Sequence, residues 1–278
     1  MKHGRFGLIG HPIAHSLSPA LFKAGYDGRY QYDLIETEDF EEAYERFLKD
    51  YDGINVTAPF KELAVRKADI LSEECRRIGA ANILIKTPEG IKAHNSDYLG
   101  VRQWLCDVAE GVKSTPPTSW AAPPAARGVA RFSAPLPPPT VLIVGLGGAG
   151  KAAAEAARSL GMEVRILNRT IYNNDIIPLG EFREEFRKAD IVIYNLPVRI
   201  PQMDELSDED FCAGQPKLIL EANYRNPSFD EELLSRMKKA NPLARYTGGR
   251  TWLLLQALTG YELFTGEKPD LSRMSAQI

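Results

Sequence analysis

Val141-Leu142-Ile143-Val144-Gly145-Leu146-Gly147-Gly148-Ala149-Gly150 is the stretch of this chain that decides its fold. Four consecutive apolar residues are typical of a strand buried on both faces of a parallel sheet. A glycine-rich turn follows, and then an alanine-rich segment, 151–160, that predicts a helix ending at Gly161. Residues 163–167 predict the next strand, so the sequence indicates a strand–turn–helix–strand unit of a doubly wound α/β domain.

The spacing of the glycines in this turn adds a functional prediction. Gly145, Gly147 and Gly150 form the pattern G-x-G-x-x-G between a strand and a helix, which is the context of a dinucleotide site. The first glycine permits the tight turn, the second lets backbone N–H groups approach a pyrophosphate, and the third lets helix pack on strand. We expect a Rossmann-like domain; the alternative is a glycine-rich turn that only joins packed elements.

The end of the second strand bears on the choice of dinucleotide. NAD sites usually carry an acidic residue about twenty residues after the glycines, whereas this chain has Asn168-Arg169-Thr170. Arg169 can pair with a 2′-phosphate and stack on adenine, and Thr170 adds a hydroxyl. This pattern favours NADP, although an exposed arginine at a strand end would leave the preference open.

The N-terminal part of the chain predicts a second α/β unit. Short β-rich runs alternate with amphipathic helical patterns, which indicates a mostly parallel sheet with helices on both faces, ending in an antiparallel hairpin. We expect strands at 5–9, 30–35 and 53–56, a hairpin at 81–93, and helices starting at Ser18-Pro19, with Ser18 as the cap, and at Asp39-Phe40.

Two helices and an insertion connect the expected units. A linking helix is predicted at 97–109 and a strongly apolar helix at 251–264, and further strands at 190–195 and 217–220. Between the predicted helix at 97–109 and the apolar strand at 141–144, residues 111–139 are rich in proline and alanine and contain no acidic residue. Such a stretch cannot supply a core. We expect a surface insertion there, with a tether or mobile flap as the alternative.

Composition excludes several classes of protein. The 278 residues carry a net charge of −3, which gives no electrostatic reason to expect a nucleic-acid or membrane partner. The three cysteines, Cys75, Cys106 and Cys212, have neither metal-ligand nor redox spacing. The chain shows no secretory signal and no membrane-spanning run. We expect a cytoplasmic protein without a metal site.

Polar residues follow the expected strand at 53–56. Asn55-Val56-Thr57-Ala58-Pro59-Phe60-Lys61 combines three polar side chains with a proline that fixes the backbone. A lysine aimed from a stiff turn at a strand end is a plausible proton donor or acceptor. The alternative is that Lys61 is a solvated surface lysine before a helix at 62–67.

Two other loops offer hydrogen-bonding groups at strand ends. Ser16 and Ser18 place two hydroxyls near a helix start, where they can hold a carboxylate. Helix capping would explain Ser18 but not Ser16. Asp97, in His94-Asn95-Ser96-Asp97, is by its position alone best explained as a helix cap; the alternative is an ion pair that holds Lys61 in place.

Taken together, these motifs resemble the shikimate dehydrogenase family in kind and in order. The resemblance covers nearly the whole chain apart from the insertion. The stretches that carry it are Gly7-Leu8-Ile9-Gly10-His11-Pro12-Ile13-Ala14-His15-Ser16-Leu17-Ser18-Pro19, Asn55 to Lys61, Gly79-Ala80-Ala81-Asn82, Asn95-Ser96-Asp97 with Gly100, the glycine loop, Asn168-Arg169-Thr170, and Gly249, Trp252-Leu253 and Gln256.

The resemblance implies roles for individual residues. It implies Lys61 and Asp97 as the catalytic pair, and as substrate-binding residues these two with Ser16, Ser18, Thr57, Asn82, Tyr224 and Gln256. It implies cofactor-binding roles for Gly145, Gly147, Gly148, Ala149, Asn168, Arg169, Thr170 and Gly249. The cofactor would be NADP(H), and the reaction the reversible reduction of 3-dehydroshikimate to shikimate in chorismate and aromatic amino-acid biosynthesis.

The departures from the family pattern all lie in the cofactor half. Tyr172-Asn173-Asn174 stands where the family often has a second basic residue, and the segment 170–195 is shorter than usual. Asn195-Leu196-Pro197 replaces a small Ala-Thr pair, and Glu221 stands in place of an aspartate. The sequence therefore indicates the substrate more firmly than the cofactor.

We thus expect two α/β domains with a cleft between them. Residues 1–104 with 250–278 form the substrate domain, and residues 105–249 form the NADP-binding Rossmann-like domain. The alternatives are an NAD-dependent quinate/shikimate dehydrogenase and a non-catalytic relative that binds shikimate. We expect a monomer or a homodimer.

Overall fold

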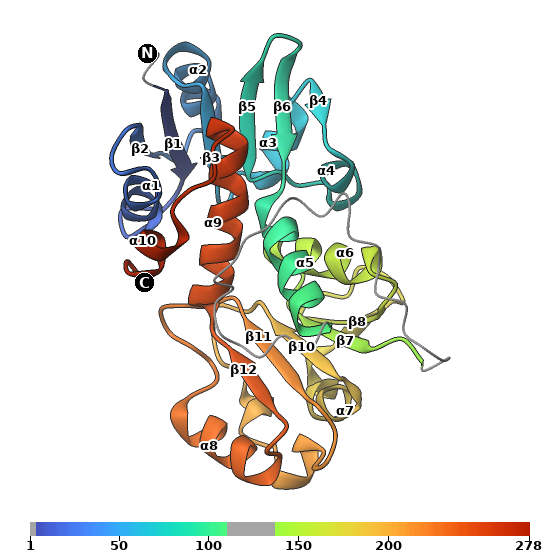
Figure 1. Ribbon diagram of the computed structural model, residues 1–278. Helices are drawn as coiled ribbons and strands as arrows, with labels where there is room; N and C mark the ends of the chain where they lie inside the picture. The colour runs from blue at the N-terminus through green and yellow to red at the C-terminus, as the bar shows by residue number, and fades with distance from the viewer. Residues whose placement is uncertain (1–3, 110–136) are drawn as a thin grey trace.

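The computed structural model describes residues 4–109 and 137–278, which form two six-stranded sheets (Figure 1). The two-domain α/β architecture expected from the sequence is confirmed. The proline- and alanine-rich stretch 111–139 lies, up to residue 136, outside the described residues. The described part holds no helix long and apolar enough to cross a membrane.

The N-terminal sheet is mixed, with strand order β2-β1-β3-β5-β6-β4. Its parallel part is formed by β1 (Arg5–Gly10), β2 (Gln31–Glu36) and β3 (Gly53–Val56). The hairpin of β5 (Ile83–Thr87) and β6 (Gly90–His94) continues it in antiparallel fashion. The two-residue strand β4 (Ile70–Leu71), which had no sequence signal, pairs in parallel with β6.

Helices cover both faces of this sheet. On one face lie α2 (Phe40–Asp50), α3 (Lys61–Lys67) and α4 (Glu73–Ile78), and on the other lies α1 (Ser18–Tyr26). Asp39 caps α2 as expected, because its carboxylate accepts hydrogen bonds from the N–H groups of Glu41 and Glu42.

The expected capping role of Ser18 is wrong. Ser18 is the first helical residue of α1, and the residue at the cap position, Leu17, offers no side-chain hydrogen bond. Instead the hydroxyl of Ser16 accepts a hydrogen bond of 3.2 Å from the N–H of Ser18. The helix therefore begins one residue earlier than expected, and the hydroxyl of Ser18 makes no bond to the first turn of α1.

The second sheet is parallel throughout, with strand order β12-β11-β10-β7-β8-β9. Its strands are β7 (Thr140–Val144), β8 (Glu163–Asn168), β9 (Ile176–Pro178), β10 (Ile191–Tyr194), β11 (Leu218–Glu221) and β12 (Arg245–Thr247). Its helices are α6 (Gly148–Ser159), α7 (Phe182–Lys188) and α8 (Glu231–Ala240), with single 3₁₀ turns at Leu179–Glu181, Pro201–Met203 and Asp208–Phe211.

The apolar run of β7 explains why this sheet is covered on both sides. Leu142 and Val144 pack into a core with α7 and α8, whereas Val141 and Ile143 pack with α6 and the two connecting helices. Successive side chains of a strand point to opposite faces, so a strand buried on both faces must be apolar at every position. The alanine-rich composition of α6 lets it lie close against this sheet.

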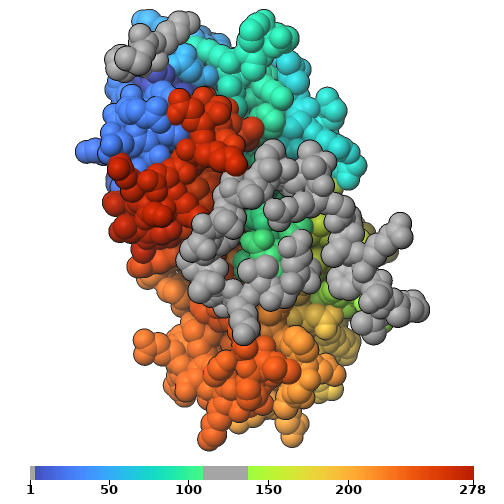
Figure 2. All heavy atoms as spheres, viewed as in Figure 1, coloured from blue at the N-terminus to red at the C-terminus, as the bar shows by residue number. Residues whose placement is uncertain are grey.

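Two long helices join the halves of the molecule. Helix α5 (Ser96–Ala109) and helix α9 (Gly249–Thr265) run alongside each other between the sheets (Figure 1). They approach closely at Gly100, where a Cβ would lie 2.9 Å from the backbone N of Gln256. After α9, helix α10 (Leu271–Ser275) packs on α1, so the red C-terminal segment lies against the blue N-terminal segment in Figure 2.

The division of the chain at 104/105 and 249/250 falls inside or beside these connecting helices. The assignment of residues 1–104 with 250–278 to one domain and of 105–249 to the other therefore stays a proposal.

The glycine-rich turn is built around one close approach. Gly145 has a φ of +92°, a backbone conformation that residues other than glycine rarely adopt. A Cβ on Gly150 would overlap the carbonyl oxygen of Gly145, so the third glycine lets α6 start directly on β7. At Gly147 a Cβ would meet no atom within 4 Å.

Gly150→Ala should therefore lower the free energy of unfolding by about 1–3 kcal/mol, because the added methyl group has no room. Gly147→Ala is the matched control and should change it by less than about 1 kcal/mol, the usual scale for a cap position. Urea denaturation of both variants measures the difference, and equal stabilities would contradict this account of the turn.

Candidate active site

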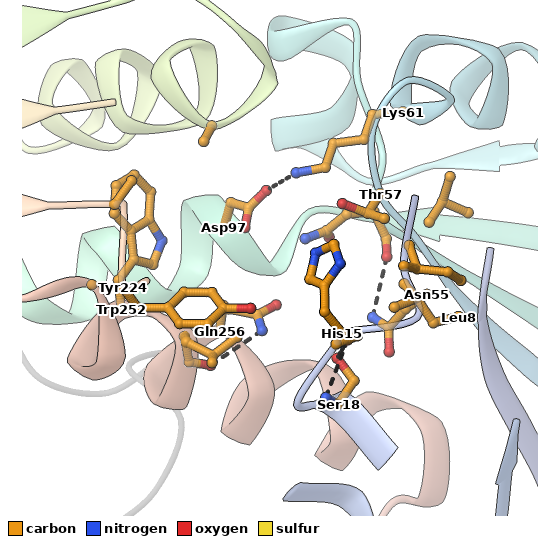
Figure 3. A pocket seen from close by; sticks show the side chains of 18 of the residues that line it. Leu8, His15, Ser18, Asn55, Thr57, Lys61, Asp97, Tyr224, Trp252 and Gln256 are labelled. Carbon is orange, nitrogen blue, oxygen red and sulfur yellow. Dashed lines mark hydrogen bonds and ion pairs between the residues drawn. The ribbon is translucent and has the colours of Figure 1, made fainter. Parts of the chain in front are cut away.

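A cavity of about 250 Å³ lies between the two halves of the molecule (Figure 3). It is lined by every residue for which the sequence implied substrate binding: Ser16, Ser18, Thr57, Lys61, Asn82, Asp97, Tyr224 and Gln256. Tyr224 comes from the second half of the chain, on the connection after β11, and Gln256 lies on α9. The tertiary structure thus brings eight residues from distant segments around one space.

Lys61 and Asp97 meet at the centre of this site. Lys61 is the first residue of α3, immediately after the loop that leaves β3, and Asp97 lies in the first turn of α5. The ammonium Nζ donates to the carboxylate Oδ2 at 2.5 Å, and only 18% and 13% of the two side chains are exposed. Lys61 is therefore not a solvated surface lysine.

Asp97 is also not the cap of its helix. The side chain of Asn95 takes that role, because its Oδ1 accepts a 3.0 Å hydrogen bond from the N–H of Tyr98. The carboxylate of Asp97 is left available for Lys61, as Figure 3 shows. An ammonium and a carboxylate held together in a half-enclosed cavity can exchange a proton with a bound molecule.

A buried hydroxyl links two of the lining amides. Ser96 has no exposed surface, and its hydroxyl donates to Oε1 of Gln256 at 3.0 Å. It also accepts from Nδ2 of Asn82 at 3.1 Å, while its backbone N–H donates to Oδ1 of Asn82 at 2.7 Å. Ser96 thereby fixes the orientation of two side chains that come from different elements.

The two serines lie next to the buried Tyr261 and the partly buried Tyr32. The hydroxyl of Ser16 donates to that of Ser18 at 3.1 Å, and the hydroxyl of Tyr261 donates to the carbonyl of Ser18 at 3.1 Å. Burial raises the pKa of Tyr261 and also that of Tyr32, so both keep their protons and act as donors. The hydrogen bond from Tyr261 therefore helps to fix the loop that carries the two serines.

Asn55 supports the site from β3. Its Oδ1 accepts from the hydroxyl of Tyr32 at 2.8 Å, and its Nδ2 donates to the carbonyl of Asn82 at 3.2 Å. These bonds use its side chain within the protein, so Asn55 holds the neighbouring Asn82 in place.

Sequence reasoning assigned no role to several residues of the lining. The polar or aromatic ones among them are His15, Asn55, Trp252 and Tyr261. The first three stand inside motifs quoted for the family resemblance, so their position in those motifs was the available signal. Tyr261 follows Gln256 by five residues on α9 and had no separate signal.

The glycine loop borders the cavity. Ala149 and Gly249 line it, and a Cβ on Gly148 would lie 3.2 Å from Cδ of Lys61. The first N–H groups of α6 have no partner within the helix, and the open space at Gly147 leaves them accessible to an anion. These residues would fit the pyrophosphate of a dinucleotide next to Lys61.

The remaining residues of the expected cofactor site lie outside this cavity. Asn168 accepts from the N–H of Leu146 at 3.2 Å and donates to the carbonyl of Thr170 at 2.9 Å, so it ties the strand end to the glycine loop. Arg169 and Thr170 are exposed, and among the described residues Arg169 has no ion pair. Their side chains are free to meet a nucleotide.

The connection after β8 is unusually short. Residues 169–175 return directly to β9 without a helix, where a crossover between parallel strands normally needs a dozen residues or more. A second cavity of about 260 Å³ lies beside it, against α6. The shortened segment noted in the sequence thus corresponds to a missing crossover helix.

Three polar contacts bridge the two halves around the site. Lys151 on α6 pairs with Glu62 on α3 at 2.6 Å, and the hydrogen bond from Lys151 lowers the pKa of Glu62. Arg77 pairs with Glu155 at 3.2 Å, and the guanidinium of Arg225 donates to the carbonyl of His15 at 3.2 Å. The described residues contain no cluster of three or more potential metal ligands.

Comparisons with known proteins agree with this geometry. Residues 8–84 match the model for the shikimate dehydrogenase substrate binding domain. Residues 116–247 match the model for the NAD binding domain of D-isomer specific 2-hydroxyacid dehydrogenases. A shikimate dehydrogenase (NADP(+)) of Thermus thermophilus is 32% identical over 286 residues, which are 97% of this chain and 95% of the relative. That of Thermotoga maritima is 28% identical and covers 84% of this chain and 83% of its own.

Solved structures share the architecture. Shikimate 5-dehydrogenase from Thermus thermophilus, in complex with NADP(H) and shikimate, superposes with a TM-score of 0.72 at 27% identity, covering 99% of this chain and 98% of that chain. Quinate dehydrogenase from Corynebacterium glutamicum, in complex with NAD, gives 0.74 at 21% identity, with 99% and 98% covered. At that identity the second likeness shows the fold alone.

Ser96→Ala should destabilise the protein by about 1–3 kcal/mol, because polar atoms of the buried Asn82 and of Gln256 lose their partner. Ser96→Thr keeps the hydroxyl and should recover most of that stability. The exposed Ser159, whose hydroxyl bonds only within α6, provides the control Ser159→Ala. Thermal unfolding compares the three, and a Ser96→Ala variant as stable as the control would remove Ser96 from this role.

Proposed function

This chain belongs to the shikimate dehydrogenase family of NAD(P)-dependent dehydrogenases, and we propose that it reversibly reduces 3-dehydroshikimate to shikimate with NADPH. In this role it would serve chorismate and aromatic amino-acid biosynthesis. The observation that carries the proposal is the Lys61–Asp97 pair, which is partly buried in the cavity and lies directly beside the glycine loop.

The chemistry follows from where the polar groups lie. The nicotinamide of a bound dinucleotide supplies a hydride to the ring ketone. The ammonium of Lys61 donates a proton to the oxygen that becomes the new hydroxyl, and in the oxidative direction the neutral amine takes that proton back. Asp97 holds the ammonium at 2.5 Å and accepts a hydrogen bond from a neighbouring hydroxyl of the substrate.

Substrate orientation depends on the remaining lining. The hydroxyls of Ser16 and Ser18 suit the carboxylate, since charge-assisted hydrogen bonds to an anion are strong. The amides of Asn82 and Gln256, locked by Ser96, suit ring hydroxyls. Thr57 and Tyr224 complete the cavity, whose volume of about 250 Å³ fits a small cyclic acid.

NADP is the preferred cofactor in this proposal because of the loop after β8. Arg169 and Thr170 offer a guanidinium and a hydroxyl that would bind a ribose 2′-phosphate, and residues 168–174 include no acidic side chain that would bind a free 2′-hydroxyl. Arginine pairs with phosphate in a bidentate manner.

One observation favours a second candidate, an NAD-dependent quinate/shikimate dehydrogenase. Only one basic residue, Arg169, stands in the short connection, which continues with Tyr172-Asn173-Asn174. An absorbance assay at the nicotinamide band, crossing NADP and NAD with shikimate and quinate, separates the two. A higher kcat/KM for NAD with quinate would select the second candidate. Shikimate binding without turnover with either cofactor would select a non-catalytic relative.

Lys61→Ala should reduce kcat by roughly 10²–10⁴, the usual contribution of one well-placed proton donor, and leave the fold intact. Lys67→Ala, at the other end of the same helix and outside the cavity, is the control and should keep wild-type kcat. Near-normal turnover of Lys61→Ala in the same assay would remove Lys61 from the catalytic role.

Arg169→Ala should raise KM for NADP by about 10- to 100-fold, the scale of a lost charge-assisted pair, and leave KM for NAD nearly unchanged. Arg187→Ala removes an exposed arginine of α7 and controls for the loss of one positive charge. An equal change in KM for both dinucleotides would indicate that Arg169 does not read the 2′-phosphate.

A further inference from the structure

We propose that Arg225 is a further substrate-binding residue, whose guanidinium supplies the positive charge that balances the carboxylate of the substrate. The proposal rests on the proposed function for the class of substrate, a small cyclic carboxylic acid. It adds a residue that neither the sequence motifs nor the cavity lining identified.

Arg225 is exposed and lies beside the residues that line the cavity. It follows Tyr224, which lines the cavity, on the connection after β11. Its Nη2 donates to the carbonyl oxygen of His15 at 3.2 Å, across the gap between the two halves. His15 itself lines the cavity, as Figure 3 shows, and the next residue is Ser16. The guanidinium is therefore anchored one residue away from the proposed carboxylate site.

The charges of the lining leave this carboxylate without a counter-charge. Apart from the imidazole of His15, the ionisable side chains expected to be charged there are Lys61 and Asp97, which neutralise each other at 2.5 Å. Ser16 and Ser18 provide hydrogen bonds but no charge. Arg225 makes no ion pair with any residue in the described ranges 4–109 and 137–278, so its charge is available to an anion.

The loop that carries Arg225 is held in place by its own hydrogen bonds. Oδ1 of Asn223 accepts from the N–H groups of Arg225 and Asn226 at 3.1 and 3.2 Å. The buried carboxylate of Glu221 accepts from the N–H of Ser228 at 2.5 Å and from the hydroxyl of Tyr246 at 2.7 Å. The backbone at Arg225 thus starts from a fixed position, which limits the entropy lost when the side chain meets a ligand.

The size of the effect follows from the exposure of Arg225. A charge pair several ångströms apart near the surface interacts through an effective dielectric between that of protein and water. The charge should therefore change the affinity for the anion by about 3- to 10-fold at low ionic strength. Salt should reduce this factor strongly, since the Debye length is about 3 Å at 1 M salt.

Two substitutions separate charge from the tether to His15. Arg225→Gln removes the charge but keeps an N–H donor, whereas Arg225→Lys keeps the charge and loses the planar fork. The control Lys239→Gln removes an exposed positive charge from α8, away from the cleft. Isothermal titration calorimetry measures Kd at fixed pH for shikimate and for its uncharged methyl ester, at low salt and at about 1 M NaCl.

Arg225→Gln should weaken shikimate binding by about 3- to 10-fold at low salt, leave the methyl ester unaffected, and lose most of the salt dependence of the wild type. Arg225→Lys and Lys239→Gln should bind shikimate nearly as the wild type does. In steady-state assays Arg225→Gln should raise KM and keep kcat, because the residue does not touch the reacting atoms.

Equal weakening of acid and ester in Arg225→Gln, or equal defects in the Gln and Lys variants, would show that Arg225 only tethers the loop and would overturn the proposal. Failure of the proposed function gives a different result, namely a wild-type protein that neither binds nor turns over shikimate. If the wild type prefers quinate, the same test applies with quinate and its methyl ester, since quinate also carries a carboxylate.

Discussion

The site depends on the close packing of helix α5 against helix α9. Only a glycine at position 100 allows this approach, since any Cβ there would lie 2.9 Å from the backbone of Gln256. The contact aligns the start of α5, which carries Ser96 and Asp97, with the face of α9 that carries Gln256. Because α5 leads from the first sheet toward the second, and α9 leads back, this packing also sets how the two halves face each other (Figure 1).

Lys61 is positioned from the other side of the cavity. Lys61 begins α3 at the end of β3, and its aliphatic chain lies beside Gly148 of the glycine loop, where a Cβ would come within 3.2 Å. The ion pair between Lys151 of α6 and Glu62, the second residue of α3, joins these two helices. An exposed pair of this kind adds little to stability. Its consequence is geometric, because it joins the helix that follows the glycine loop to the helix that starts at Lys61.

The cofactor half departs from the usual doubly wound design at one place. Strands β8 and β9 are joined by residues 169–175 without a crossover helix, and the side chains of Ile171 and Tyr172 are 55% and 69% exposed. The connection therefore offers exposed apolar surface and a single guanidinium beside the second cavity. The substrate half shows no comparable reduction: its serines, amides and Lys61–Asp97 pair are all held by hydrogen bonds that are buried or partly buried.

The sequence by itself determined the architecture, and the family resemblance named half of the residues that line the cavity. Unbroken apolar runs, a glycine pattern between strand and helix, and polar residues at strand ends are local features, and local features can be read from a single chain. They predicted both sheets, the hairpin and the connecting helices. Strands of two or three residues, such as β4, β9 and β12, escaped prediction because pairing with neighbouring strands stabilises them, and their own composition does not.

Only the tertiary structure decided between interpretations that the residues left open. It showed that Asn95 caps α5, so that Asp97 forms an ion pair with Lys61. It also showed that Ser18 does not cap α1. It placed the buried hydroxyl of Ser96 between two amides that are 174 residues apart in the chain, at positions 82 and 256. It also brought Arg225 to His15 across the cleft. Such contacts depend on how two sheets are held against each other, and a pattern within one segment carries no information about that distance.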